Sequence, residues 1–342
     1  MTIDEQLLPF RGRCSFKQYI PSKPARYGIK TFALVDLGTF YTFNLETYLG
    51  TQPDRRFEMS NKAMDVVLRL VEPIKNSGRN ITADNWFASI ELIKNLAKLK
   101  LSYLRTMRKN KPQIPLEFLP CKDRPLLSSL FAFLQVDKYF ITLVSYVPKK
   151  KKAIVLASSM HADDAVDLKH AKRKPEMILD YNSDKCGVDM VDQMCATYSV
   201  QRTTRRWPWV AIANLLNISA INAHVVYYSN HRGGRRISRY QFLQNLGRAL
   251  ILPQIAKRSN VKQVHTSTRR RCLELIGAAT SDEAPVVFGP LSREKPNQPQ
   301  KLCFLCKNNH NHTKNSRHSC AKCFKHVCSE HFYKICDNCI PK

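Results

Sequence analysis

Acidic residues are scarce in this sequence. Its 342 residues include 27 Asp and Glu against 55 Lys and Arg, which gives a formal net charge of +28 at pH 7. Such an excess is more than solubility requires, and its usual partner is a polyanion, above all nucleic acid. The charge is uneven, because residues 196–275 hold 14 Lys and Arg but a single acid, Glu274. That segment is the candidate DNA-facing surface.

The sequence also lacks an uninterrupted apolar run of the roughly 18 to 20 residues that span a bilayer. Its first residues, MTIDEQLLPFRGR, carry an acidic pair where a secretory signal peptide would be basic. No basic amphipathic helix or lipidation motif points to a membrane surface. With 44% apolar residues, the sequence predicts an intracellular globular protein with no membrane partner.

Most of the twelve cysteines are gathered at one end of the chain. Five are scattered, at Cys14, Cys121, Cys186, Cys195 and Cys272, whereas seven lie between residues 303 and 339. Together with one histidine, these seven form four pairs: Cys303 and Cys306, Cys320 and Cys323, Cys328 and His331, and Cys336 and Cys339. In a reducing compartment this spacing favours zinc over disulfides.

Four ligand pairs predict two closed tetrahedral zinc sites. We expect them to interleave, with Cys303, Cys306, Cys328 and His331 on one ion and Cys320, Cys323, Cys336 and Cys339 on the other. A stretch of about 40 residues cannot build an adequate core unaided, so metal binding would supply much of its folding energy. His310, His312 and His318 lie in the long loop as substitute ligands, which we rank below the eight. The partner of such a module stays open, because cross-brace folds serve DNA, histone tails and ubiquitin conjugation.

Strands and helices alternate in residues 1–107, which indicates an α/β layer. We expect strands at 28–37, 41–49, 80–84 and 101–107, a helix at 64–74 that Pro73 ends, and a second helix after Ser89. Residues 108–174 open with prolines at 112, 115, 120 and 125 and continue with three β-rich runs, which predict an inserted β-rich subdomain. Helical character returns near Asp180 and continues in a long run from Trp207. Prolines and polar residues at 280–300 mark an exposed linker.

Four acids lie where a metal site would need them. Asp84 follows a predicted strand at the start of a helical pattern, and Asp4 lies in the predicted strand TIDEQLL. Asp189 and Asp192 are three residues apart and so share one face of a predicted helix. Clustered carboxylates raise each other's pKa unless a cation neutralises them, and Mg²⁺ or Mn²⁺ suits oxygen ligands. Two such ions about 4 Å apart can activate water and stabilise the departing 3′ oxygen of a phosphodiester.

Residue spacing alone does not select these acids. Asp36, Asp180 and Asp184 are rivals for the same role, and each acid can equally be a turn residue or a solvated surface group. The basic segment has a similar alternative, since Lys and Arg runs often only solvate a helix face.

Several motifs occur together and in order: TIDEQLLPFRGR, YIPSKPARYGIK, VVLRLVEPIKNSGRNITADNWF, GVDMVDQM, RTTRRWP and the terminal cysteine array. Over nearly the whole chain this series resembles the piggyBac transposase family. The resemblance implies an RNase H-like, integrase-type catalytic domain with an acidic triad. Asp4, Asp84 and Asp189 fall on the triad positions, and Asp192 falls on an accompanying fourth acid.

The resemblance also implies a domain order. It assigns residues 1–107 and 175–197 to the two parts of the catalytic domain, 108–174 to a β-rich insertion and 198–277 to the second half of a helical dimerisation and DNA-binding domain. A linker at 278–300 and a cross-brace zinc domain at 301–342 follow. The implied reaction is cut-and-paste DNA transposition at TTAA targets, through hydrolysis, a hairpin on the element and strand transfer. It implies Mg²⁺ or Mn²⁺ at the triad, two structural Zn²⁺, double-stranded DNA of transposon ends as partner, a homodimer and a nuclear location.

The chain departs from the family at its N-terminal side. The acidic N-terminal region and the first half of the helical domain are missing, so we expect exposed apolar faces between Trp209 and Tyr228. We also expect Asp4, close to a chain end, to be loosened by fraying. The chain is then either part of a longer transposase or a domesticated derivative. A non-catalytic nuclear DNA- or chromatin-binding protein is the alternative function, and a ubiquitin ligase a distant third.

Ten arginines are the predicted phosphate contacts: Arg202, Arg205, Arg206, Arg232, Arg235, Arg236, Arg239, Arg269, Arg270 and Arg271. Such contacts set affinity and its salt dependence without reading bases. Trp207 and Trp209 are predicted to be core residues. The tract 149–152 is either a nuclear import signal or a solvated turn.

Overall fold

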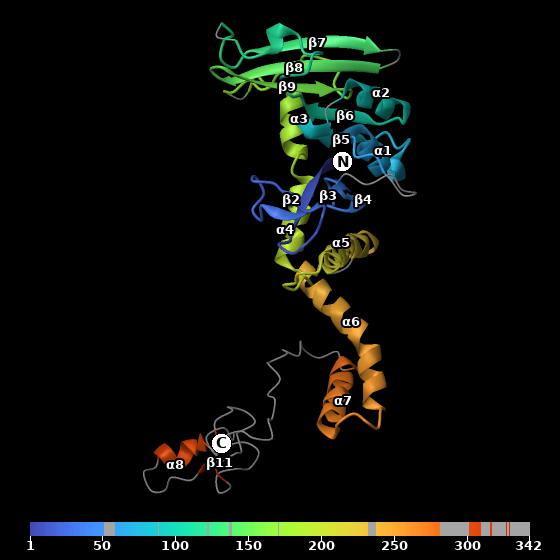
Figure 1. Ribbon diagram of the computed structural model, residues 1–342, viewed down its shortest axis with the longest axis vertical. Helices are drawn as coiled ribbons and strands as arrows, with labels where there is room; N and C mark the ends of the chain where they lie inside the picture. The colour runs from blue at the N-terminus through green and yellow to red at the C-terminus, as the bar shows by residue number, and fades with distance from the viewer. Residues whose placement is uncertain are drawn as a thin grey trace. The chain divides into compact units, whose positions relative to one another are not determined.

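The computed structural model describes residues 1–50, 59–87, 89–121, 123–136, 139–169, 171–231, 237–280, 301–308, 315–316, 326 and 328. The chain divides into two compact units, residues 1–250 and 251–342. The larger one contains the sheet and helices α1 to α5 (Figure 1).

A mixed sheet organises the first unit. Within the described ranges it has nine strands: β1 (Thr2–Pro9), β2 (Gln18–Tyr19), β3 (Tyr27–Val35), β4 (Thr42–Thr47), β5 (Asn80–Ala83), β6 (Ser102–Thr106), β7 (Ser129–Val136), β8 (Tyr139–Lys149) and β9 (Lys152–Ser158). Their order is β2-β3-β1-β5-β6-β9-β8-β7, and β4 also pairs with β3, on the same edge as β2. The centre, β1-β5-β6, is parallel, and the remaining pairs are antiparallel.

Helices α1 (Ala63–Leu70) and α2 (Ile90–Lys98) cover one face of the sheet. As predicted, α2 follows Ser89, and Pro73 lies in a short 3-10 helix, η1 (Glu72–Ile74), that terminates α1. Two further 3-10 helices are η2 (Asn85–Phe87) and η3 (Leu116–Phe118). The apolar stripes of α1 and α2 pack on inward-facing strand residues to form the main core, which includes Ile3, Phe32, Val67, Ile81, Leu92, Leu96 and Tyr103. The predicted α/β layer is confirmed here.

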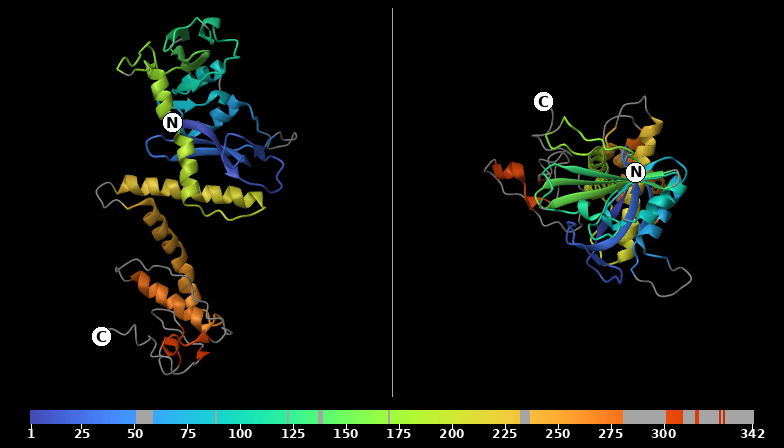
Figure 2. Two further views of the ribbon diagram at one scale, coloured as in Figure 1. Left: turned by 90° about the vertical axis from the view of Figure 1, so that its left-hand side faces the viewer. Right: turned by 90° about the horizontal axis from the view of Figure 1, so that it is seen from above.

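Helices α3 (Glu176–Asp184) and α4 (Gly187–Thr197) lie on the opposite face of the sheet (Figures 1 and 2). Val188 and Val191 of α4 pack against Ala33 and Val35 of β3. The buried residues of α3 pack in the same way against β6, β8 and β9. The face opposite the main core therefore belongs to the two helices that follow residue 175.

Strands β7, β8 and β9 come from the segment predicted as a β-rich insertion. Strand β9 pairs antiparallel with β6, with Leu104 opposite Ser158, so these strands continue the main sheet. The boundaries 108–174 and those of the other predicted domains stay predictions.

Helix α5 (Trp207–Asn230) is the one described helix that is long and apolar enough to cross a membrane by length and composition alone, with a mean hydropathy of 1.4. It nevertheless packs in the first unit. Val210, Ala213, Ile218 and Ile221 are buried, and Asn217 uses its side chain to accept a hydrogen bond from the Val200 backbone at 3.0 Å. Packing on the sheet domain therefore accounts for the apolar residues of one face of α5.

The prediction that Trp207 and Trp209 are core residues is wrong. They are 38% and 43% exposed, and Trp207 meets one ring, Phe16, edge-on at 5.0 Å. Helix α5 is apolar on all sides, but only one of its faces contacts the sheet and α4. The expected exposed apolar face is confirmed on the other side, for example at Leu215 and Leu216.

Helix α6 (Arg239–Ser259) runs across the division between the units. The second unit contains its last turns, α7 (Thr266–Thr280), α8 (Phe304–Asn308) and the antiparallel pair β10 (Lys301–Leu302) and β11 (Asn315–Ser316). The predicted linker at 278–300 lies almost entirely outside the described residues.

Candidate active site and cysteine cluster

Two central parallel strands place Asp4 and Asp84 beside each other. Ile3 of β1 pairs with Ala83 of β5, so the next residue of each strand lies at the same level of the sheet. Ile3 and Ala83 face the main core, and side chains alternate along a strand. Asp4 and Asp84 therefore face the opposite side, which α3 and α4 cover.

The expected fraying of Asp4 is wrong. Strand β1 is paired along its length with β3 and at Thr2 and Ile3 with β5, and both of these residues are fully buried. The ammonium group of Met1 donates a 3.0 Å hydrogen bond to the backbone oxygen of Asn80. A strand held on both sides is a rigid support for a ligand, wherever it lies in the chain.

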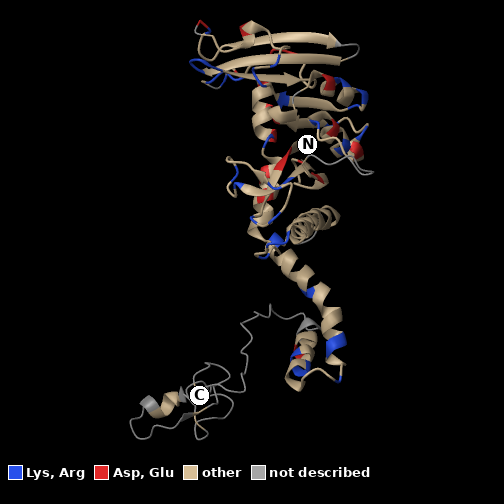
Figure 3. Ribbon diagram, viewed as in Figure 1, with Lys and Arg blue, Asp and Glu red and all other residues tan. Residues whose placement is uncertain are grey.

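Helix α4 brings the third and fourth acids to the same face. Its buried Val188 and Val191 fix it against β3, and it also contacts β1. Asp189 is exposed, and Asp192, one turn later, is half-buried. In Figure 3 the ribbon is red at acidic positions in the region of β1 and α4. The site thus combines acids from β1, the end of β5 and α4.

A lysine that the sequence analysis missed lies among these acids. Lys23 Nζ is 2.9 Å from Asp189 Oδ1, and it interacts electrostatically with Asp4 and Asp192. Lys23 belongs to the turn between β2 and β3. No spacing rule connects this turn with α4, so no local signal in the sequence marks the residue.

Burial raises the pKa values of Asp4 and Asp192, the two less accessible acids. Desolvation raises the pKa of Asp4 to about 7, and the nearby charges of Glu5 and Asp189 raise it further. The backbone N–H of Glu5 donates a 2.8 Å hydrogen bond to the Asp4 carboxylate and has the opposite effect on this pKa. Desolvation, with Asp189 beside it, raises the pKa of Asp192 to about 6, against the lowering effect of Lys23. Burying carboxylates in this way is costly unless a cation compensates them.

Asp84 is exposed, and a residue of β6 holds one of its carboxylate oxygens. Thr106 Oγ1 donates a 3.1 Å hydrogen bond to Asp84 Oδ1, and the phenol of Tyr181 is hydrogen-bonded to Thr106 in turn. Burial raises the pKa of Tyr181 to about 12, so it stays a neutral donor. One carboxylate oxygen of Asp84 is thus oriented by β6.

The three rival acids have structural partners. Asp36 accepts hydrogen bonds from the backbone and hydroxyl of Thr39 in a turn. Asp180 lies 3.1 Å from His161 Nε2. Asp184 accepts from the Thr82 hydroxyl at 3.0 Å and thereby ties α3 to β5. These contacts explain the three acids without a metal.

The donor set fits a hard divalent cation. The acids supply only oxygen ligands, which Mg²⁺ and Mn²⁺ prefer, and the buried carboxyl of Asp4 needs positive charge. In the part of the chain that the structure describes, however, no three carboxylates bring their oxygens within 4.8 Å of one another. The ammonium group of Lys23 lies beside Asp189.

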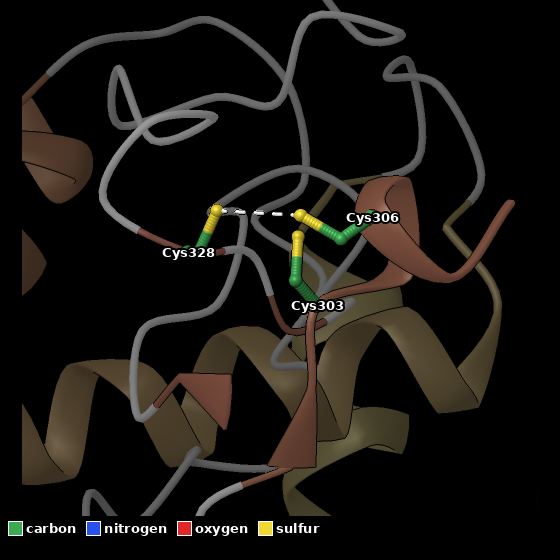
Figure 4. A group of neighbouring side chains, drawn as sticks. All are labelled: Cys303, Cys306 and Cys328. Carbon is green, nitrogen blue, oxygen red and sulfur yellow. Dashed lines mark hydrogen bonds between the residues drawn. The ribbon is translucent and has the colours of Figure 1, made fainter. Parts of the chain in front are cut away.

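Three cysteine sulfurs do converge. The Sγ atoms of Cys303, Cys306 and Cys328 lie within 4.8 Å of one another, and those of Cys306 and Cys328 are 3.7 Å apart (Figure 4). Cys303 and Cys306 flank the start of α8, and all three are buried. Three of the four ligands predicted for one ion are thus together. The fourth, His331, and the second set, Cys320, Cys323, Cys336 and Cys339, lie outside the described residues, as do His310, His312 and His318.

The predicted phosphate-binding arginines differ in their surroundings. Arg202, Arg205 and Arg206 are exposed before α5. Arg239 is partly buried and donates to the Met194 backbone oxygen at 2.8 Å. In the second unit, Arg269 donates to the backbone oxygens of Val261 and Lys262, and Arg270 and Arg271 pair with Glu274. Arg232, Arg235 and Arg236 lie outside the described residues.

Comparisons with known proteins agree on one family. The family model described as Transposase IS4 matches residues 1–224. Two human proteins, PiggyBac transposable element-derived protein 3 and the Chimeric ERCC6-PGBD3 protein, are each 30% identical over 121 residues, which is 34% of this chain. The matched stretch spans only 20% and 11% of those two proteins.

A solved structure is similar over nearly all of this chain. The piggyBac transposase of a synaptic complex with hairpin DNA, determined by electron cryo-microscopy, matches with a TM-score of 0.72 and 36% identity. The match covers 99% of this chain and 69% of that transposase. The chain therefore belongs to the piggyBac transposase family.

Proposed function

We propose that this chain is the catalytic and C-terminal part of a metal-dependent DNA transposase. Its fold would be RNase H-like, with the acids of β1, β5 and α4 as the catalytic set. The observation that carries the proposal is the placement of Asp4 and Asp84 side by side on parallel central strands, with Asp189 presented to the same face by α4. The similar solved transposase, which is in complex with hairpin DNA, supports DNA as the substrate.

Asp4, Asp84 and Asp189 would hold Mg²⁺ or Mn²⁺, with Asp192 as a fourth acid. When bound, such ions activate water and neutralise charge on a phosphodiester. The protein's own groups position the reactants: Thr106 orients Asp84, and α4 fixes Asp189. No protein nucleophile is needed, because positioning and charge neutralisation carry the rate.

The family gives the finer proposals. The reaction would be cut-and-paste transposition at TTAA targets, in which a 3′ hydroxyl makes a hairpin on the element before strand transfer. The protein would act in the nucleus as a homodimer on transposon ends. The terminal module would bind two structural Zn²⁺, one of them through the converged cysteines Cys303, Cys306 and Cys328.

The test is Mg²⁺-dependent cleavage of a DNA duplex that carries a transposon end next to TTAA. Wild type should nick this duplex, and Asp84→Asn should lose the activity by a factor of the order of 10³ or more. Asp36→Asn is the matched control, since Asp36 only caps a turn, and it should cleave as wild type does. Cleavage by Asp84→Asn at the wild-type rate would refute the assignment.

A non-catalytic DNA- or chromatin-binding protein is the second candidate. It is favoured by the absence, in the described part of the chain, of any three carboxylates within 4.8 Å. In that case DNA binding would persist at physiological salt, while neither wild type nor Asp84→Asn would cleave, even when an N-terminal segment of a piggyBac transposase is supplied in trans.

A further inference from the structure

Lys23 is held in place by its own turn. The backbone N–H of Lys23 donates to the Ile20 oxygen at 3.2 Å, and the Arg26 N–H donates to the Lys23 oxygen at 3.0 Å. Arg26 has a positive φ of 56°, which tightens this reversal of the chain. The side chain of Lys23 is only 18% exposed and ends 2.9 Å from Asp189 Oδ1. Its position is therefore part of the fold rather than one of many surface rotamers.

The charged groups that act on Lys23 are carboxylates. Asp189 is its hydrogen-bond partner, and Asp4 and Asp192 act on it through space. All three acids belong to the proposed catalytic set. An ammonium group here offsets part of the repulsion between carboxylates that burial has already made costly. In effect, the site already contains a cation supplied by the chain.

The same space would be needed by a divalent ion. A metal bound through Asp189 Oδ1 would displace the hydrogen bond from Lys23, and one bound through Oδ2 of the same carboxylate would still lie close to the ammonium group. A cation of charge +2 within about 4 Å of an ammonium repels it by an energy of the order of several kcal/mol at the effective dielectric of a partly buried site. The two cations therefore compete for one carboxylate.

We propose that Lys23 is a built-in counter-cation that stabilises the acidic cluster before metal binds and is displaced from Asp189 when a divalent metal enters. This inference rests on the proposed function, because it assumes that the same acids are the metal ligands. Lys23 is then a positioning residue with two opposite effects. It stabilises the metal-free arrangement of the acids, and it lowers the affinity for the first metal ion.

If Lys23 competes with the metal, its removal changes the metal affinity in a direction that no other role of Lys23 predicts. If Lys23 had only a structural role, its removal would leave the metal affinity unchanged or reduce it, because the acids would lose their arrangement. A competing lysine would increase metal affinity when removed, although the metal-free protein becomes less stable. Opposite changes in stability and in metal affinity are therefore the signature.

The experiment is calorimetric titration of the full chain with Mn²⁺, together with thermal unfolding in a chelator. Lys23→Met should bind Mn²⁺ roughly tenfold more tightly than wild type, and its metal-free melting temperature should fall. Lys30→Met is the matched control, since Lys30 is 15% exposed and pairs with Glu5 at 3.2 Å on the same sheet. It should lose stability without a change in Mn²⁺ affinity.

Two further variants separate the possible failures. Asp84→Asn defines the site: if it leaves wild-type Mn²⁺ binding intact, or if wild type binds no Mn²⁺, the metal site itself is refuted and Lys23 competition with it. If Asp84→Asn abolishes binding but Lys23→Met binds Mn²⁺ no more tightly than wild type, only the Lys23 proposal is overturned. If Lys23→Met does not fold, Lys23→Gln replaces it in this comparison.

Discussion

Thr106 Oγ1 donates a 3.1 Å hydrogen bond to Asp84 Oδ1, so β6 orients an acid carried by β5. Groups that orient a ligand from behind typically change metal affinity or activity by 10- to 100-fold. We predict that Thr106→Val lowers Mg²⁺-dependent nicking by about tenfold with little change in melting temperature. Thr39→Val removes a similar hydroxyl contact, from Thr39 to Asp36 at 2.7 Å, and should leave nicking unchanged. Equal rates for both variants would show that Thr106 does not orient the acid.

Arg105 is fully buried in β6 with no hydrogen-bond partner for its three guanidinium nitrogens among the described residues. Burial lowers its pKa to about 10, and the Tyr103 ring, 5.7 Å away, compensates only in part. An uncompensated buried charge costs several kcal/mol, so we predict that Arg105→Met raises the unfolding free energy by about 2 kcal/mol. The measurement is urea denaturation.

The matched control for Arg105 is another arginine. Arg124 donates to the hydroxyl of Ser145 at 2.7 Å and to its backbone oxygen at 2.9 Å. Arg124→Met should therefore destabilise the protein. A loss of stability in Arg105→Met as well would mean that Arg105 has an anionic partner after all.

The raised pKa of Asp4, about 7, predicts a pH dependence of the metal-free protein. An acid whose pKa is higher in the folded state keeps its proton between about pH 4 and pH 7, whereas the unfolded chain loses it. Stability should fall as pH rises through this window, by the order of 2 kcal/mol. Thermal unfolding of Asp4→Asn should show a flatter profile. Identical slopes in wild type and Asp4→Asn would exclude Asp4 as the cause.

The cysteine cluster predicts a metal content. Elemental analysis of purified protein should find two Zn per chain, and Cys306→Ser should lose one ion, because Cys306 lies with Cys303 and Cys328. Cys272→Ser is the control, as Cys272 is also buried but lies in α7. Fewer than two ions in wild type would contradict the eight-ligand interpretation.

Local patterns made the acids candidates but did not select them. The junction of a strand and a helical pattern marked Asp84, and helical spacing marked Asp189 and Asp192 as neighbours. The resemblance to the piggyBac family chose these acids, and neither source gave their setting. Whether Asp4 would be rigid depended on strand pairing with distant residues, which spacing does not encode. The position of Lys23 depends on a turn meeting a helix more than 160 residues later, so it too was missed.

Burial was similarly difficult to predict where several elements meet. Apolar composition suggested that Trp207 and Trp209 are core residues, but composition does not say which side of an all-apolar helix meets the sheet. Arg105 lies within a run that reads as a buried strand, and only the structure shows that its guanidinium has no hydrogen-bond partner among the described residues. Of the predicted zinc ligands, Cys303, Cys306 and Cys328 lie together in the structure, and the other five stay a prediction because they lie outside the described residues.

The central claim is that Asp4, Asp84 and Asp189 share divalent cations. Anomalous diffraction from crystals soaked in Mn²⁺ tests it directly. The account predicts a peak about 2 Å from carboxylate oxygens of Asp4 and Asp84, with Asp189 turned away from Lys23 toward the ion. A map with no peak between these carboxylates, in a crystal whose cysteine cluster holds zinc, would contradict it.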